Sequence, residues 1–362
     1  MAVKNNELEK NLLLLLITII LFLTVSEIIF RVVYNSILIR DTWWKEYDLE
    51  WYNEHLDEEY SRHLINYDIQ KGEGVFRIAI LGDSYAFGFG EENGLVLRNE
   101  TVDKSYPKFL ETFLNNNFDD YEYEVLNFAW VAVSALEMSY ILEDYVVEYN
   151  PDLVIIQIAD NDRYTAVFNI DPFVYCDIEV SLYERIVYRL KRTFRLLDYL
   201  VMDILTENGY ASYYYYEVYS YNSEKRIGER CFVKSLQRID SLLSGGKGGT
   251  EIPSLIFYFY ELGYSPDTTD FNEYYNPDMI AEVNKTFTSI GFDVLYTNDY
   301  LFDIDLDQIY GDDLRHFNEK GNIFAATIIY NYLLNNSLVP SCESQECTPK
   351  LLEVGPRRVE LE

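Results

Sequence analysis

From residue 76 onward, apolar runs alternate with helical patterns, and this alternation restricts the fold more than any other feature of the chain. The run DLVIIQIA is almost continuously apolar, which is typical of a central parallel strand with helices on both faces. Apolar residues at helical spacing lie between the runs, around 106–114 and 138–146. This repeated β-α alternation predicts an α/β fold with a parallel sheet. We expect its strands at 76–81, 123–128, 152–159, 254–260 and 292–296.

The alternation stops between residues 163 and 249, and we interpret this stretch as an insertion of helices packed beside the sheet. It contains a basic amphipathic pattern, LYERIVYRLKRTFRLLDYL, followed by the tyrosine-dense YASYYYYEVYSY. Tyrosine rings bury a large area and keep a polar tip. The segment therefore fits either a platform that stacks on sugars or a packed edge segment, of which the second is the simpler interpretation.

The N-terminal segment LLLLLITIILFLTV carries no charge, and apolar residues resume in IIFRVVY. As a helix, the uncharged part would be only about 21 Å long, against about 30 Å for the hydrocarbon core of a bilayer. Adding the residues up to Val33 makes it long enough, with Glu27 and Arg31 one turn apart and able to pair. We therefore predict a transmembrane anchor over 12–34. The alternative is a signal peptide cleaved near the small residues at 24–26.

The charge balance excludes one class of partner. The chain has 61 acidic and 29 basic residues, which give a formal net charge of −32. Such an excess repels a nucleic-acid backbone and an anionic bilayer surface. We therefore expect no nucleic-acid partner, and attachment to the membrane only through the N-terminal helix.

Four cysteines form an even set that allows two disulfides in three possible pairings. Cys342 and Cys347 lie in the polar tail segment SCESQEC, where a short local bridge is the simplest pairing. The other two are Cys176 and Cys231. Together with the anchor, disulfides would place the bulk of the chain outside the cytoplasm. The alternative is that all four are free thiols.

Polar residues follow the predicted strands at the points where the strands end. In ILGDSYAFGFG the first apolar run stops at a glycine and Ser84 comes two residues later. Residues 129–132 follow the second strand, and Asn161 and Asp162 follow the third. Ligands of open parallel sheets bind beyond the carboxyl ends of the strands. We therefore expect these residues to meet at one edge of the sheet.

A serine nucleophile needs a base, and the chain contains only three histidines. His55 and His63 lie in a charged stretch without an apolar pattern, which favours solvated side chains. His316 stands just before the last predicted helix, in GDDLRHFNEKG, with Asp313 three residues earlier. One short turn could present both groups, so that the carboxylate holds the imidazole while its other nitrogen faces Ser84.

The segments ILGDSYAFGFG, LNFAWVA, IADND and DLRHFNEKG occur in the order and approximate spacing of the SGNH hydrolases, the GDSL lipase/esterase superfamily. The chain resembles this superfamily over residues 76–334 outside the insertion, and is most similar to its membrane-anchored branch. The resemblance implies a flavodoxin-like three-layer fold with a parallel sheet. It divides the chain into a tail over 1–11, the anchor over 12–34, a linker over 35–75, a hydrolase-like domain over 76–336 and a C-terminal tail over 337–362.

By this resemblance Ser84 is the nucleophile, His316 the general base and Asp313 its orienting partner. The oxyanion hole would consist of the backbone N–H groups of Ser84 and Ala132 and the side-chain amide of Asn161. For Asn161, the alternative is a purely structural role in closing a turn with its neighbour. Asp83 would cap the helix after the turn. No cofactor and no metal ion are expected.

Two positions depart from the pattern of the superfamily. Ala132 stands where a glycine is usual after the second strand, and Ala159 replaces a glycine two residues before Asn161. If the first position needs a positive φ, its methyl group costs roughly 1 kcal/mol. These changes fit a narrowed acyl site or a catalytically silent relative.

The function that the resemblance implies is hydrolysis of acyl esters, including O-acetyl esters of surface glycans, by a membrane-anchored enzyme. One alternative is transfer of the acyl group to a glycan by the same triad, and another is a silent glycan-binding protein. An α/β-hydrolase also has Ser, Asp and His in this order. However, its elbow is G-x-S-x-G, and GDSYA lacks the second glycine.

Overall fold

The computed structural model describes the chain in two compact units, one over residues 1–59 and 179–223 and the other over 60–178 and 224–362. The boundary at 223–224 falls inside the predicted insertion, whose tyrosine-dense part lies outside the described residues. The description covers residues 10–11, 13–15, 17–18, 21–26, 67–88, 104–118, 121–130, 133–159, 162, 224–245, 251–259, 277–301, 304, 306–310 and 316–340.

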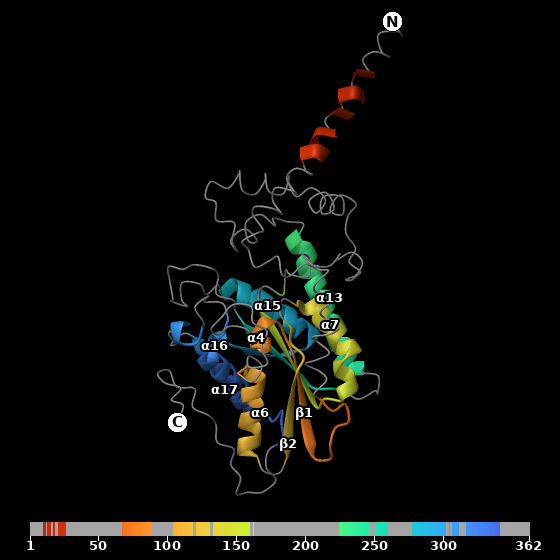
Figure 1. Ribbon diagram of the computed structural model, residues 1–362. Coiled ribbons are helices and arrows are strands. Elements are labelled where there is room, and N and C mark those ends of the chain that lie inside the picture. The colour runs from red at the N-terminus through yellow and green to blue at the C-terminus, as the bar shows by residue number, and fades with distance from the viewer. Residues whose placement is uncertain are drawn as a thin grey trace. The chain divides into compact units, whose positions relative to one another are not determined.

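The second unit is built on a parallel sheet of five strands in the order β2-β1-β3-β4-β5 (Figure 1). This order is that of flavodoxin-like folds, so the predicted α/β fold with a flavodoxin-like parallel sheet is confirmed. Each strand begins within about one residue of its predicted position. The strands are β1 Val75–Leu81, β2 Glu122–Asn127, β3 Leu153–Ala159, β4 Ser254–Phe259 and β5 Asp293–Tyr296.

β3 lies in the middle of the sheet and is buried along its whole length, as its continuous apolar run predicted. It pairs with β1 from Ile78↔Leu153 to Leu81↔Ile156 and with β4 from Val154↔Ser254 to Ala159↔Phe259. Because all pairs are parallel, the carboxyl ends of all strands lie along one edge of the sheet.

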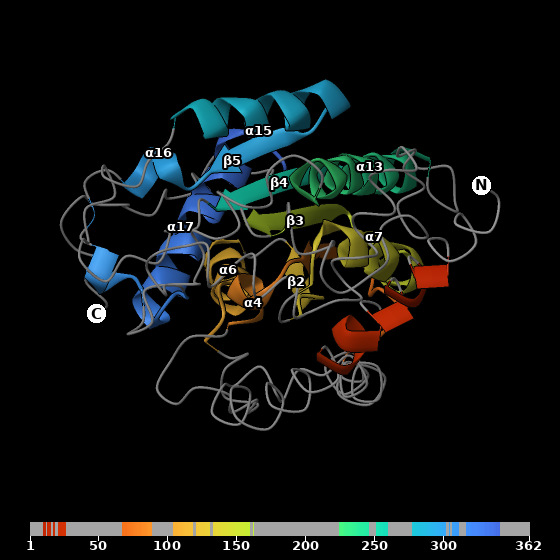
Figure 2. The same ribbon diagram turned by 90° about the horizontal axis from the view of Figure 1, so that it is seen from above.

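Helices cover the sheet on both faces, which completes three layers (Figure 2). α6 (Tyr106–Asn117) packs against α17 (Glu319–Asn335) on one face. On the other, α13 (Glu224–Gly245) packs between α7 (Ala135–Asp144) and α15 (Pro277–Ile290). α13 thus joins β3 to β4 as a crossover helix. The shorter helices are α4 Ser84–Phe87, η4 Val146–Tyr149, α16 Asn298–Leu301 and η5 Leu306–Gln308.

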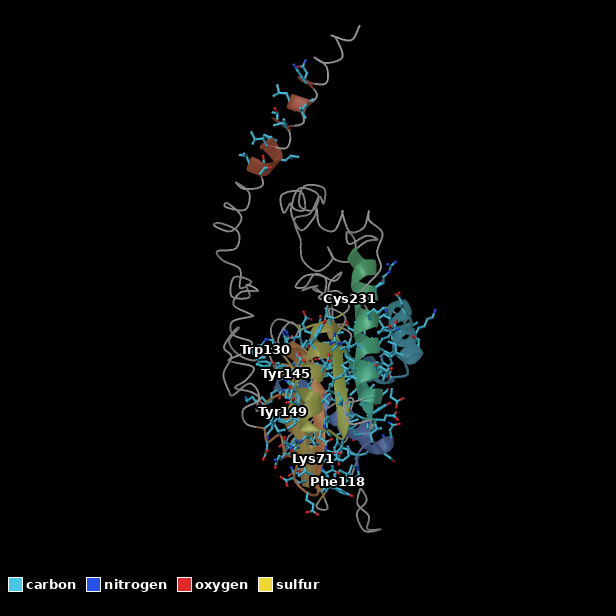
Figure 3. The ribbon with its side chains drawn as sticks, turned by 90° about the vertical axis from the view of Figure 1, so that its right-hand side faces the viewer. Lys71, Phe118, Trp130, Tyr145, Tyr149 and Cys231 are labelled. Carbon is cyan, nitrogen blue, oxygen red and sulfur yellow. The ribbon has the colours of Figure 1, made fainter. Side chains whose placement is uncertain are left out.

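A charged cluster closes the amino edge of the sheet. Arg77 is fully buried; its Nε donates to Glu124 Oε2 at 2.7 Å, and one terminal nitrogen donates to the Tyr149 carbonyl at 2.7 Å. Its backbone N–H donates to Asp152, which also pairs with Lys71. Figure 3 shows Lys71 toward one end of the sheet and Trp130, which follows β2, toward the other.

In the first unit, the described residues of the predicted anchor are helical at 13–15, 17–18 and 21–26. Among the residues that the structure describes, no helix is long and apolar enough to cross a membrane. The rest of the segment over 12–34 lies outside the described residues, so the anchor stays a prediction.

Candidate active site

Ser84 is the first residue of α4, a single turn of helix directly beyond the carboxyl end of β1. Asp83 is its N-cap, and its Oδ1 accepts a hydrogen bond from the Tyr85 N–H at 2.9 Å, which confirms the predicted capping role. A side chain at Gly82 would not fit, because a Cβ there would lie 2.6 Å from the Ala86 Cβ and from Gln157 Oε1. The GDS segment is therefore a tight strand-to-helix turn.

The turn brings Ser84 to a histidine from the other end of the domain. Ser84 Oγ lies 2.9 Å from His316 Nε2, a hydrogen-bonding distance across 232 residues of sequence. Ser84 is buried, with 8% of its surface exposed, and His316 is half-buried. Of the predicted triad, the structure thus brings these two residues together, while Asp313 lies outside the described residues.

The segment after His316 explains why the motif continues with asparagine and glycine. Asn318 caps α17 by accepting the Gly321 N–H at 3.0 Å, and its Nδ2 donates to the Tyr310 carbonyl at 2.9 Å. A Cβ at Gly321 would lie only 2.0 Å from the Ile309 carbonyl oxygen. These contacts hold the start of α17, two residues after His316, against residues 309–310.

A buried polar cluster lies beneath the nucleophile turn. Gln157 lies on β3, in the middle of the sheet, and its Oε1 accepts a hydrogen bond from the Asp83 N–H at 3.0 Å. Burial raises the pKa of Asp83 to about 6, although the Tyr85 N–H, the charge of His316 and Gln157 act in the opposite direction. Burial and the charge of Asp83 raise the pKa of the Tyr106 phenol well above its ordinary value.

Within the described part of the chain, three atoms of this cluster have no hydrogen-bond partner: Asp83 Oδ2, Gln157 Nε2 and the Tyr106 hydroxyl. The sequence indicated only a capping role for Asp83 and no role for Gln157 or Tyr106. For Gln157 a signal was present, since it is the one polar residue between the buried apolar positions of β3. A buried amide at that place has to serve a neighbouring polar group.

The segment after β2 runs beside the same turn. The Trp130 N–H donates to the Gly82 carbonyl at 3.0 Å, and the Asn127 side chain donates to the Ala86 carbonyl at 2.8 Å. At the end of β3, Asp162 folds back and accepts the Ala159 N–H at 2.7 Å. The two other predicted oxyanion donors, Ala132 and Asn161, lie outside the described residues.

Neither a protein-family model nor a curated protein sequence matches this chain. Several solved structures do match it. One is Est24, a carbohydrate acetylesterase from Sinorhizobium meliloti (14% identity, 72% of this chain and 99% of that chain, TM-score 0.41). Others are the aryl esterase of M. smegmatis (15%, 73% and 100%, 0.39) and a lipase/acylhydrolase from Enterococcus faecalis (11%, 72% and 96%, 0.40). Likeness at these levels carries no activity over to this chain.

Proposed function

We propose that this chain is a serine ester hydrolase of the SGNH type. The observation that carries the proposal is the 2.9 Å contact between Ser84 Oγ and His316 Nε2 at the carboxyl edge of the sheet. Ser84 follows β1, next to β3, where the strand order reverses. Flavodoxin-like folds bind their ligands at that point. A hydroxyl and an imidazole in contact there are the parts that nucleophilic acyl transfer requires.

In the proposed reaction, Ser84 Oγ attacks the ester carbonyl carbon while its proton moves to His316 Nε2. The carbonyl becomes an oxyanion, and the backbone N–H of Ser84, at the start of α4, is one donor for it. His316 then gives the proton to the leaving alcohol. Water attacks the acyl carbon next while its proton moves to His316 Nε2, and His316 returns that proton to Ser84 Oγ as the carboxylic acid leaves. We assign Asp313 to orienting His316, and Ala132 and Asn161 to the remaining oxyanion donors.

We propose a small acyl group, such as acetyl, on a surface glycan as the substrate class. The chain has alanines at 132 and 159, where the pattern of the superfamily has glycines. We infer that their methyl groups narrow the acyl site. A site narrowed in this way favours a short acyl chain over a long one.

We also propose that the chain is a single-pass membrane protein with its hydrolase-like domain outside the cytoplasm. The described residues of the segment over 12–34 support this, because large apolar side chains are exposed all around the helix. A helix that is apolar on every side fits lipid better than water. These side chains are Leu13, Leu14, Leu15, Ile17, Leu21, Phe22, Leu23 and Val25.

The test is to incubate the purified full-length protein with an acetylated surface polysaccharide and to measure free acetate. We expect release by the wild-type protein and almost none by Ser84→Ala. If an added unacetylated glycan became acetylated and no free acetate appeared, the reaction would be acyl transfer and not hydrolysis. Equal release by wild type and Ser84→Ala, at the level of buffer alone, would contradict the proposed function.

A further inference from the structure

The residue after the proposed nucleophile lies in an unusually aromatic environment. Tyr85 is buried, and its ring stacks on Phe259 at a centroid distance of 5.1 Å and an interplanar angle of 16°. The same ring lies 5.4 Å from the His316 imidazole at 43°, and 5.6 Å from Phe317 at 76°. The imidazole that contacts Ser84 therefore rests against the ring of the next residue in the chain.

The other two rings give Tyr85 a fixed place. Phe259 is the last residue of β4, so the sheet holds its backbone, and Phe317 follows His316 directly. They contact each other at 5.0 Å, and each is only 1% exposed. Rings at these separations and angles are in the favourable range for aromatic pairs. Tyr85, Phe259 and Phe317 thus form an aromatic cluster attached to the sheet, and its Tyr85 ring contacts the His316 imidazole.

We propose that Tyr85 is a positioning residue for the general base: its ring orients the His316 imidazole toward Ser84 and stabilises the imidazolium that forms during attack. This inference rests on the proposed function. When Ser84 Oγ bonds to the acyl carbon, its proton moves to His316 Nε2 and the imidazole becomes cationic. The π face of an aromatic ring within about 6 Å attracts such a cation, and more strongly where water is excluded. The charge appears only during the reaction, so the ring assists the transition state more than substrate binding.

Two substitutions distinguish the effect of the aromatic ring from the effect of side-chain volume. Tyr85→Leu keeps an apolar side chain but removes the π face, and we expect kcat to fall about 5- to 30-fold with KM little changed. Tyr85→Phe keeps the ring and should stay within about twofold of the wild type. Loss of packing alone would not give this result, in which kcat falls in Tyr85→Leu but not in Tyr85→Phe while KM stays constant.

Phe287→Leu is the matched control for packing. Phe287 is also a fully buried ring, in contact with Phe232 and Tyr258, but it lies in the last turn of α15, which leads to the amino end of β5. The Phe287→Leu substitution should lower Tm as much as Tyr85→Leu does while leaving kcat unchanged. Equal losses of kcat in Tyr85→Phe and Tyr85→Leu, or in Phe287→Leu, would overturn the positioning role.

A second measurement does not depend on turnover. With only three histidines in the chain, the imidazole C–H signals of His316 can be assigned by NMR through their loss in His316→Gln. In the wild type we expect them to be sharp and shifted upfield by the Tyr85 ring, and in Tyr85→Leu to broaden and lose that shift. Unchanged signals in Tyr85→Leu would overturn the inference. If Ser84→Ala equals the wild type in the ester assay, the proposed function fails, while these signals still decide whether Tyr85 positions His316.

Discussion

Gln157 in the central strand accepts a hydrogen bond from the Asp83 backbone N–H at 3.0 Å, and so links the sheet to the turn that carries Ser84. Both residues are buried, so water cannot replace this bond. The same amide oxygen would lie only 2.6 Å from a Cβ at Gly82, which explains why the turn needs glycine there. The position of the nucleophile therefore depends on one polar side chain inside an apolar strand.

We expect Gln157→Leu to lower the free energy of unfolding by about 1 to 3 kcal/mol, because the Asp83 N–H would remain buried without an acceptor. Urea unfolding of both proteins measures this difference. Gln70→Leu, at an exposed site, is the control and should change stability by less than about 0.5 kcal/mol. A Gln157→Leu protein as stable as the control would show that the hydrogen bond is dispensable.

Ser84→Ala and His316→Ala should each reduce kcat for ester hydrolysis by at least about 10³-fold, and the double variant should be little worse than either. Each single loss already prevents proton transfer from the hydroxyl to the imidazole. The measurement is a double-mutant cycle on one soluble acetyl ester. Losses that simply add would mean that the two residues do not act as a pair.

The sequence predicted the sheet well because each strand carries its own local pattern. The apolar run of β3 and the glycine that follows β1 are each a signal contained within a few residues. The ring contacts of Tyr85 have no such signal, since they join residues that are 174 and 231 positions away in Phe259 and His316. Only the folded sheet brings those rings together, so a sequence pattern could not predict them.

For the site, the pairing of Ser84 with His316 followed from order along the chain and from the small number of histidines. The burial of Asp83 did not, because GDS is typical of a polar turn. In the fold, Asp83 is buried near Tyr106 on α6 and Gln157 on β3. Polar residues at strand ends are predictable from sequence. The electrostatic environment that surrounds them depends on neighbours from other elements.

Cys231 on α13 is buried and disulfide-bonded. The other three cysteines lie outside the described residues. If Cys342 and Cys347 form the predicted local bridge, Cys231 must pair with Cys176. Non-reducing peptide mapping of the protein from its host should therefore find these two pairs. A peptide that links Cys231 to the C-terminal tail would show that the local bridge is wrong.

Replacing Arg77 should affect stability but not catalysis. Arg77→Met removes the buried guanidinium and leaves the Tyr149 carbonyl and Glu124 without their donor. We expect the free energy of unfolding to fall by about 2 to 4 kcal/mol. This is less than the largest cost of breaking a buried ion pair, because Glu124 is one-third exposed and can be hydrated. Because the cluster lies at the edge opposite Ser84, kcat per folded molecule should be unchanged.

The control for this change is Lys108→Met, which breaks the exposed pair with Glu111 on α6 and should cost less than about 1 kcal/mol. Chemical unfolding gives the stabilities, and activity is corrected for the folded fraction. A large loss of kcat in folded Arg77→Met would contradict a purely structural role for this cluster.

The stability of the protein should depend on pH through Asp83. The pKa of Asp83 is raised in the folded state to about 6, mainly by burial, from an ordinary value of 3.8. A raised carboxyl pKa means that folding favours the protonated form. Its contribution to stability is therefore full below pH 3.8 and is lost as pH rises through about 6. The groups that face this carboxyl are the Tyr85 N–H, Gln157, His316 and the Tyr106 phenol.

Asp83→Asn removes this titration but keeps an oxygen that can accept the Tyr85 N–H and cap α4. Relative to the wild type, we expect the variant to gain about 1 kcal/mol or more of unfolding free energy between pH 4 and pH 7. Asp68→Asn is a matched control, because Asp68 also accepts an N–H two residues later at 2.9 Å, in Gln70, but is exposed to water. The difference in unfolding free energy between Asp68→Asn and the wild type should not grow between pH 4 and pH 7. Urea unfolding at four pH values measures both differences, and a flat difference for Asp83→Asn would show that the carboxyl is not destabilised by its burial.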